Sequence, residues 1–379
     1  MKDIKKDTKK DIKYIGVYIH IPFCKARCGY CDFLTFACSN HYYEPYKNAL
    51  LREIDNCEIL ADYKITSIFI GGGTPTVLPP NFIGEILQAM GKYNIEADAE
   101  ITIEANPATL SLKMLRTLKN NGVNRLSIGL QTWRNPLLKK IGRNHTCQDF
   151  LKNYNHARQL GFKNINVDVI FSLPHTKSNK YWSETVRNVA KLSPEHISAY
   201  SLSIEENTPF FNENICQSSE EDDRQMYHFA INYLTKKGYN HYEISNFAKP
   251  GKECCHSLLY WHRGEYVGLG LGASGFINGK RTKNITNIKK YMRGENIPNY
   301  YDITKKDAMS EFMYLGLRCI DGIDPKEFEK NFKTPLEQVF GEELKKNFNK
   351  GLLCEKHDKI ALSKQGLNIS NTVMADFLL

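Results

Sequence analysis

The feature that most constrains the fold is a sixfold alternation of short apolar segments with helical patterns. Segments rich in β-branched residues predict strands at 14–22, 65–70, 100–105, 125–130, 165–171 and 196–204. Helical periodicity predicts helices at 43–60, 81–92, 112–120, 149–160, 181–192 and 221–237. Repeated βα units form a parallel sheet with right-handed crossovers. The alternation therefore predicts an α/β fold, either a doubly wound sheet or a partial barrel of six βα units, (β/α)6, like part of a TIM barrel.

The pattern changes after Gly238 and predicts a division into four parts. Residues 1–13 form a polar tail, 14–240 the core barrel, and 241–303 an extension with a strand at 242–248 and a glycine-rich apolar stretch at 266–275. Residues 304–379 carry helical patterns followed by a short hairpin, which resembles a winged-helix module. Its candidate recognition segment, 335–349, mixes glutamates with lysines and suits phosphate poorly. We therefore expect a packing or lid domain that binds no nucleic acid.

Charge and hydropathy narrow the functional classes further. The formal net charge is +9, but basic residues are scattered among acidic ones and form no stripe. The longest apolar runs, 258–261 and 312–315, are about one helical turn long, too short for a membrane span or a secretion signal. We expect a cytoplasmic protein without a membrane span, whose diffuse positive field still allows peripheral contact with an acidic membrane.

Three of the eleven cysteines have a ligand-like spacing. Cys24, Cys28 and Cys31 form a Cys-x3-Cys-x2-Cys loop directly after the first predicted strand. Iron–sulfur clusters and structural zinc sites usually take four cysteines, so three leave one metal position open. On a [4Fe-4S] cluster the open iron can bind nitrogen and oxygen donors of a second molecule. The alternative is a zinc site whose fourth ligand is Cys38 or His41.

Polar residues also stand where the predicted strands end. Gly71–Thr74 follows the second strand, Glu104 closes the third, Gln131 closes the fourth, and Asp168 lies within the fifth. Ligands of parallel α/β sheets bind at the carboxyl ends of the strands. We therefore expect these residues and the cysteine loop to form one site.

The motifs together resemble a known superfamily. The segment from Tyr18 to Phe33, Tyr-x-His-x-Pro-Phe-Cys-x3-Cys-x-Tyr-Cys-Asp-Phe, is similar to the signature of the radical S-adenosylmethionine (radical SAM) proteins. Later segments are similar to the branch that contains oxygen-independent coproporphyrinogen III oxidase and the HemW haem chaperones: GGGTPT at 71–76, EANP at 104–107, RLSIGLQ at 125–131, GRNH at 142–145, NVD at 166–168, YEISNFA at 242–248 and YW at 260–261. The resemblance covers the chain from about Tyr14 to its end and implies the partial barrel.

The resemblance also implies cofactors and residue roles. Cys24, Cys28 and Cys31 would each hold one iron of a [4Fe-4S] cluster, leaving the fourth iron for S-adenosylmethionine (SAM). The other implied SAM contacts are Tyr30 near the adenine, Gly72, Gly73 and Thr74 near the methionine part, Glu104, Gln131, Arg143 and Asp168 at the ribose and the charged end, and Tyr18 at the rim of the first strand. An electron donor such as a flavodoxin or ferredoxin would drive reductive cleavage of SAM.

Two activities occur within this branch, and the sequence favours one. The oxidase carries a fourth cysteine where this chain has Phe33, and it has a longer N-terminal extension. Both differences favour a haem chaperone, which delivers haem to respiratory proteins, over the alternative of coproporphyrinogen decarboxylation. One departure concerns the chaperone segment His-Asn-x-x-Tyr-Trp, because Ser257 stands in place of the asparagine. His256 in that segment is a candidate axial haem ligand, with a structural hydrogen-bonding role as the alternative.

Overall fold

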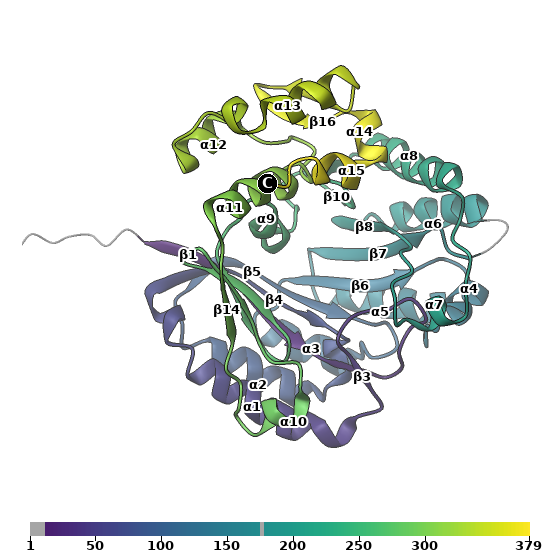
Figure 1. The fold of residues 1–379 in the computed structure, drawn as a ribbon. Coiled ribbons are helices and arrows are strands. Elements are labelled where there is room, and N and C mark those ends of the chain that lie inside the picture. Colours follow the sequence, from purple (N-terminus) through teal and green to yellow (C-terminus); the bar gives the residue numbers. More distant parts are fainter. Residues whose placement is uncertain (1–11, 175–177) are drawn as a thin grey trace, which may run out of the picture.

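The six strands of the core lie in the sheet in the same order as in the chain. A computed structural model describes residues 12–174 and 178–379, so most of the expected polar tail lies outside the described residues. Six neighbouring parallel strands form the core: β1 (Lys13–Ile21), β4 (Tyr63–Gly72), β5 (Ile95–Ala105), β6 (Arg125–Gln131), β7 (Ile165–Phe171) and β8 (His196–Ser201). A doubly wound sheet requires a point where the strand order reverses. Because the order never reverses here, the core is the open (β/α)6 partial barrel, and that prediction is confirmed (Figure 1).

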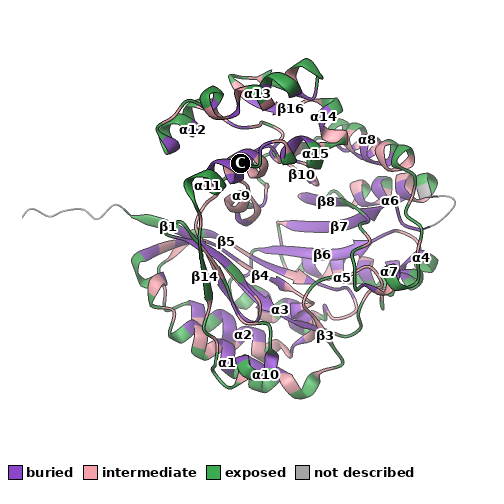
Figure 2. Cartoon of the chain, in the orientation of Figure 1, coloured by how far each residue is buried: buried purple, intermediate pink, exposed green. Residues whose placement is uncertain are grey.

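The core helices follow the predicted alternation. They are α1 (Tyr43–Asp55), α2 (Pro80–Met90), α3 (Leu112–Asn120), α4 (Asn135–Lys140), α5 (Cys147–Gln159), α6 (Ser178–Leu192), α7 (Pro209–Asn212) and α8 (Glu220–Lys236). Helix α1 ends before the expected residue 60, and a short 3-10 turn, Glu58–Asp62, leads into β4. The strands of the core are buried while the helices expose their outer faces, as Figure 2 shows. Burial of β-branched residues between sheet and helices is thus what holds the barrel together.

The sheet continues beyond the barrel at both edges. Next to β1 lie β11 (Tyr266–Leu269), parallel to it, and then β12 (Ser274–Ile277), β13 (Lys280–Lys283) and β14 (Asn299–Asp302), all antiparallel. Helix α10 (Ile288–Met292) connects the last two strands. At the other edge, the prediction of a single strand at 242–248 is wrong. The chain turns there, and β9 (Asn240–Glu243) and β10 (Asn246–Ala248) form a hairpin because the Glu243 carboxylate accepts hydrogen bonds from the Ser245 N–H, at 3.0 Å, and the Asn246 amide.

The C-terminal region has its own apolar core. It contains α11 (Lys305–Gly316), α12 (Pro325–Phe332), α13 (Leu336–Asn349), the hairpin β15 (Leu353–Lys356) and β16 (Lys359–Leu362), α14 (Lys364–Asn368) and α15 (Ser370–Ala375). Met313, Phe328 and Phe340 lie at the centre of this core. Three helices followed by a hairpin agree with a winged-helix-like arrangement. The region contacts the extension through Glu311, whose carboxylate pairs with Arg263 and with Arg281 of β13, each at 2.9 Å.

Helix α9 (Cys255–Trp261) is the short helix that carries the His-Ser-Leu-Leu-Tyr-Trp segment. It contacts β4 on one side and α11 on the other. Figure 1 shows α9 between the barrel and the C-terminal helices. The extension therefore links the interior of the barrel to the C-terminal region.

Candidate functional site

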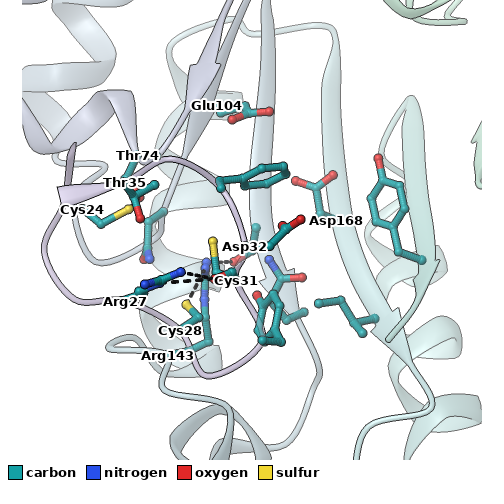
Figure 3. A pocket seen from close by; sticks show the side chains of 18 of the residues that line it. Cys24, Arg27, Cys28, Cys31, Asp32, Thr35, Thr74, Glu104, Arg143 and Asp168 are labelled. Carbon is teal, nitrogen blue, oxygen red and sulfur yellow. Dashed lines mark hydrogen bonds between the residues drawn. The ribbon is translucent and has the colours of Figure 1, made fainter. Parts of the chain in front are cut away.

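A cavity of about 380 Å³ lies at the carboxyl ends of the parallel strands. In Figure 3, the cysteine loop lies on one side of it, and Glu104 and Asp168 project from the strands on the other. The sequence-predicted residues that line it are Cys24, Cys28, Tyr30, Cys31, Gly72, Gly73, Thr74, Glu104, Gln131, Arg143 and Asp168. These predicted residues, up to 144 positions apart in the sequence, thus meet in one site, as the rule for parallel sheets predicts.

The cysteine loop is held in place by backbone contacts on both sides. Gly29 donates its N–H to Ile141 O at 3.1 Å and accepts from the Phe210 N–H at 2.9 Å. A Cβ at Gly29 would lie 2.3 Å from the Phe210 ring, so no larger residue fits there without a shift. The loop between Cys28 and Cys31 is therefore fixed against the loops that follow β6 and β8.

The three sulfurs have different neighbours. The Cys24 Sγ lies 3.5 Å from Thr74 Oγ1, and the Cys28 Sγ accepts a hydrogen bond from Arg143 Nη1 at 3.7 Å. Burial raises the pKa of Cys24 and raises that of Cys31 to about 11. Both thiols are therefore protonated near neutral pH, and a metal must displace their protons to bind.

The donor set fits a cluster better than a single zinc ion. In the described part of the chain, no three His, Cys, Asp or Glu side chains gather where one metal ion could bind. A cubane does not require this, because each thiolate binds a different iron. The alternative fourth zinc ligands have other partners: the Cys38 thiol donates to Lys25 O at 3.4 Å, and the His41 ring contacts Tyr42.

The charged groups of the cavity suit a ligand that carries both positive and negative charges. Burial and the charge of Asp168 raise the pKa of Glu104 to about 8, although the Gly72 N–H donates to its Oε2 at 3.1 Å. Arg143 donates from Nη2 to Gly129 O at 2.6 Å, and its buried Nε has no hydrogen-bond partner among the described residues. Two acids and one buried guanidinium thus complement a ligand that carries an ammonium or sulfonium and a carboxylate.

The glycines after β4 are also required by the protein itself. Gly72 has φ +110°, and a Cβ there would lie 2.5 Å from the His20 ring. A Cβ at Gly73 would lie 2.6 Å from the Phe23 carbonyl oxygen. Both glycines therefore let the end of β4 pack against β1 and against the start of the cysteine loop, in addition to any close approach of a ligand.

Two sequence-predicted residues do not line the cavity. Tyr18 donates its hydroxyl to His20 Nδ1 at 2.9 Å, and His20 Nε2 in turn donates to Leu34 O at 3.2 Å. Tyr18 thus lies one side chain behind Gly72, and its contact with a cofactor stays a prediction. The second residue is His256.

His256 is buried in α9, with 1% of its surface exposed. Its Nδ1 bonds to Ser67 Oγ and its Nε2 to the Tyr260 hydroxyl, both at 2.8 Å. Burial and the nearby Arg125 lower its pKa to about 3, so the ring is neutral. Ligation of haem iron by His256 would require breaking one of these bonds and opening the segment.

Sequence reasoning missed several residues of the cavity wall. Ser127, two residues before Gly129 on β6, and Tyr200 at the end of β8 both line it, as do residues 201–203 and Glu205. A signal for them existed, because inward-facing residues alternate along a strand and the strand-end rule applies to the sixth strand as well. Arg27 lines the opening and donates to Cys31 O from Nε at 3.3 Å and from Nη2 at 3.1 Å.

Comparisons with known proteins agree with this geometry. The model of the Radical SAM superfamily matches residues 18–187, and that of the HemN C-terminal domain matches residues 303–369. Among solved structures, coproporphyrinogen III oxidase (HemN) from Escherichia coli superposes with a TM-score of 0.85 and 23% identity, covering 98% of this chain and 91% of that one. At this identity the likeness shows the fold alone.

Curated relatives are more similar in sequence. The heme chaperone HemW of Lactococcus lactis is 37% identical over 372 residues, covering 96% of this chain and 97% of the relative. The proteins of the same name from Bacillus subtilis and Escherichia coli are 36% and 32% identical, and each comparison covers 96% of this chain and 99% or 98% of the relative. The cysteine loop, the strand-end residues and this similarity along the whole chain agree, and the chain belongs to the HemW family of radical SAM proteins.

Proposed function

We propose that this protein is a haem chaperone, which binds haem and delivers it to haem-requiring respiratory proteins. The observation that carries the proposal is the end-to-end similarity to relatives named heme chaperones. The alternative, oxidative decarboxylation of coproporphyrinogen III, rests on a likeness that shows only the fold. Phe33, which stands where the oxidase has its fourth cysteine, lines the cavity and is 62% exposed. It offers an apolar ring at the opening where a thiol would otherwise stand.

The radical SAM family implies a [4Fe-4S] cluster and SAM. We propose that Cys24, Cys28 and Cys31 hold the cluster. The proposed SAM contacts are Tyr30, Gly72, Gly73, Thr74, Glu104, Gln131, Arg143 and Asp168, with Tyr18 behind them. When bound, a reduced cluster supplies an electron for reductive cleavage of the sulfonium, and a flavodoxin or ferredoxin is the proposed electron donor.

The chain's own residues position the ligand and exclude water. Glu104 and Asp168 face the cavity as acceptors for an ammonium and for ribose hydroxyls, while Arg143 offers a buried guanidinium to a carboxylate. Tyr30 contacts Phe210, with ring centroids 6.5 Å apart, and closes the side of the cavity beneath the cysteine loop. These side chains are in place without a ligand, which reduces the reorganisation that binding requires.

None of the helices in the described residues is long and apolar enough to cross a bilayer. We propose that the protein acts in the cytoplasm and receives and delivers haem there.

We expect haem to bind stably to the anaerobically reconstituted protein. Haem titration should give a Soret band that remains with the protein through gel filtration, because a chaperone must retain its cargo between donor and acceptor. The same preparation, supplied with SAM, reductant and coproporphyrinogen III, should form no protoporphyrinogen. A Soret band lost on the column would contradict the chaperone function, and formation of protoporphyrinogen would establish the oxidase instead.

Replacing His256 with glutamine should lower stability without moving the Soret band. The change disturbs the hydrogen bonds to Ser67 and Tyr260, and we expect a loss of about 1–3 kcal/mol in the free energy of unfolding. His241→Gln is the matched control, since it removes a half-buried histidine, bonded to Ile244 O at 3.1 Å, without touching α9. A shifted or lost Soret band in His256→Gln alone would identify His256 as a haem ligand.

A further inference from the structure

A chain of hydrogen bonds runs through the barrel interior from Asp168 toward the start of α9. The Asp168 carboxylate accepts from Asn166 Nδ2 at 2.7 Å and from Ser127 Oγ at 3.0 Å, one bond to each oxygen. Asn166 Oδ1 bonds to His196 Nδ1 at 2.7 Å, and His196 Nε2 bonds to the Tyr242 hydroxyl at 2.8 Å. Four elements, β6 to β9, thus contribute to one connected group behind the cavity.

The donor and the acceptor of every hydrogen bond in this network can be assigned. Both contacts of Asn166 Nδ2, with Asp168 and with Ser127 Oγ at 2.8 Å, require an N–H donor, so Asn166 Oδ1 is the acceptor and His196 Nδ1 carries a proton. Burial and Arg125 lower the pKa of His196 well below its usual range, so the ring is neutral and its Nε2 accepts from the Tyr242 O–H. The Tyr242 oxygen then accepts the Cys254 N–H at 3.2 Å.

Every donor therefore points toward Asp168. Asn166 and His196 are 2% and 1% exposed, so water competes little for these bonds. Bonds aligned in this way polarise one another and become stronger together in a buried site. The arrangement fixes both oxygens of Asp168 from behind, while the side chain faces the cavity (Figure 3).

At the end opposite Asp168, the hydrogen-bond network reaches the segment that begins α9. Glu100 accepts there from the Cys254 thiol at 3.4 Å, the Cys255 N–H at 3.2 Å and the His256 N–H at 3.3 Å. Tyr242 also accepts the Ile320 N–H of the C-terminal region at its backbone oxygen, at 3.0 Å. A displacement of this segment would therefore move the Tyr242 hydroxyl and, through it, the donors that hold Asp168.

We propose that Asn166, His196 and Tyr242 are positioning residues that hold Asp168 for the ribose of SAM and couple SAM affinity to the seating of α9. The inference rests on the proposed cofactor role of Asp168 and extends it to residues outside the cavity. It predicts that changes at α9 alter SAM binding although α9 does not line the site.

The test removes a single hydroxyl. Tyr242→Phe deletes the donor to His196 and should weaken SAM binding to the reconstituted protein by roughly 10-fold. It should also reduce the preference of the protein for SAM over an analogue that lacks the ribose hydroxyls, which a merely structural loss would leave unchanged. Tyr227→Phe is the matched control, because Tyr227 is buried and its hydroxyl donates to Ile244 O at 2.8 Å, outside this hydrogen-bond network.

Two further variants make the result decisive. Ser198→Ala removes a second donor to Asn166 Oδ1, at 3.1 Å, and should produce a smaller effect in the same direction even if Tyr242→Phe folds poorly. In an Asp168→Ala background, Tyr242→Phe should have no further effect on SAM affinity. Unchanged affinity and preference in Tyr242→Phe and Ser198→Ala would overturn this inference alone, whereas a wild-type protein that binds no SAM would overturn the cofactor assignment and the inference together.

Discussion

Replacing Cys28 with alanine is expected to give a folded but colourless protein. Its thiol is one of three proposed iron ligands, and two thiolates do not hold a cubane whose fourth iron already lacks a protein ligand. Iron in anaerobically reconstituted protein should fall from about four atoms per chain to almost none. The broad visible absorption should disappear with it.

The fold should survive this change because Cys28 lies on a loop outside the apolar core. Its sulfur is half-buried and accepts one hydrogen bond, from Arg143, so the melting temperature of the cluster-free protein should move by only a few degrees. Cys216→Ala, at an exposed cysteine away from the loop, is the matched control and should keep full colour. Brown, iron-loaded Cys28→Ala protein would contradict the assignment, and a zinc-loaded, colourless wild type would restore the zinc alternative.

Cluster assembly should also depend on pH. Burial raises the pKa of Cys31 to about 11 and also that of Cys24, so raising the pH toward 9 increases the thiolate fraction and should speed incorporation of iron. The measurement is the rate at which visible absorption develops between pH 7 and pH 9 in wild type. The rate should depend on pH because the thiols are buried and protonated in the metal-free protein.

Much of the fold could be predicted because each signal was local. Strand β7 (Ile165–Phe171) and helix α3 (Leu112–Asn120) begin and end where the periodicity places them. The hairpin at 240–248 was missed because a buried side chain, Glu243, forms the turn by accepting two bonds. A run of residues with strand propensity does not reveal such a turn, since its acceptor is defined only in the folded chain.

The residues of the site also fall into those that the sequence could predict and those that it could not. Strand-end residues such as Glu104 and Asp168 could be placed because parallel topology brings all strand ends to one edge. The contact of His256 with Ser67 could not, because Ser67 comes from β4, 189 residues away in the sequence. Whether a buried histidine binds a ligand or completes a hydrogen-bond network depends on such distant contacts, and the sequence alone left both roles open for His256.

Replacing Glu104 with glutamine is expected to stabilise the cluster-free protein at alkaline pH and to weaken SAM binding. The pKa of Glu104 is about 8 in the fold against 4.5 ordinarily, so the folded state binds a proton that the unfolded state has released. The stability that depends on this proton is fully present below pH 4.5 and is lost as the pH rises through 8. Each pH unit in this window costs about 1.4 kcal/mol, on the order of 5 kcal/mol in total.

Glutamine carries no charge and keeps an oxygen that accepts the Gly72 N–H. Urea unfolding should therefore show a large gain for Glu104→Gln at pH 8.5 and a gain of about 1 kcal/mol or less at pH 5. Glu205→Gln, at an exposed carboxylate of the same cavity, should change little at either pH. Equal stability of wild type and Glu104→Gln at pH 8.5 would contradict the raised pKa.

The second measurement, SAM affinity, should change in the opposite direction to stability in Glu104→Gln. If the ionised carboxylate of Glu104 binds the positive end of SAM, SAM affinity of wild type should rise with pH up to about 8, and Glu104→Gln should lose at least 10-fold in affinity and this pH dependence. Titration of SAM into both proteins between pH 6 and pH 9 measures this. A half-buried acid kept beside Asp168 at a cost in stability is explained by a ligand that needs the charge. If Glu104→Gln is more stable and still binds SAM tightly, the charge of Glu104 is not needed for SAM binding. Glu104 would then be removed from the proposed site.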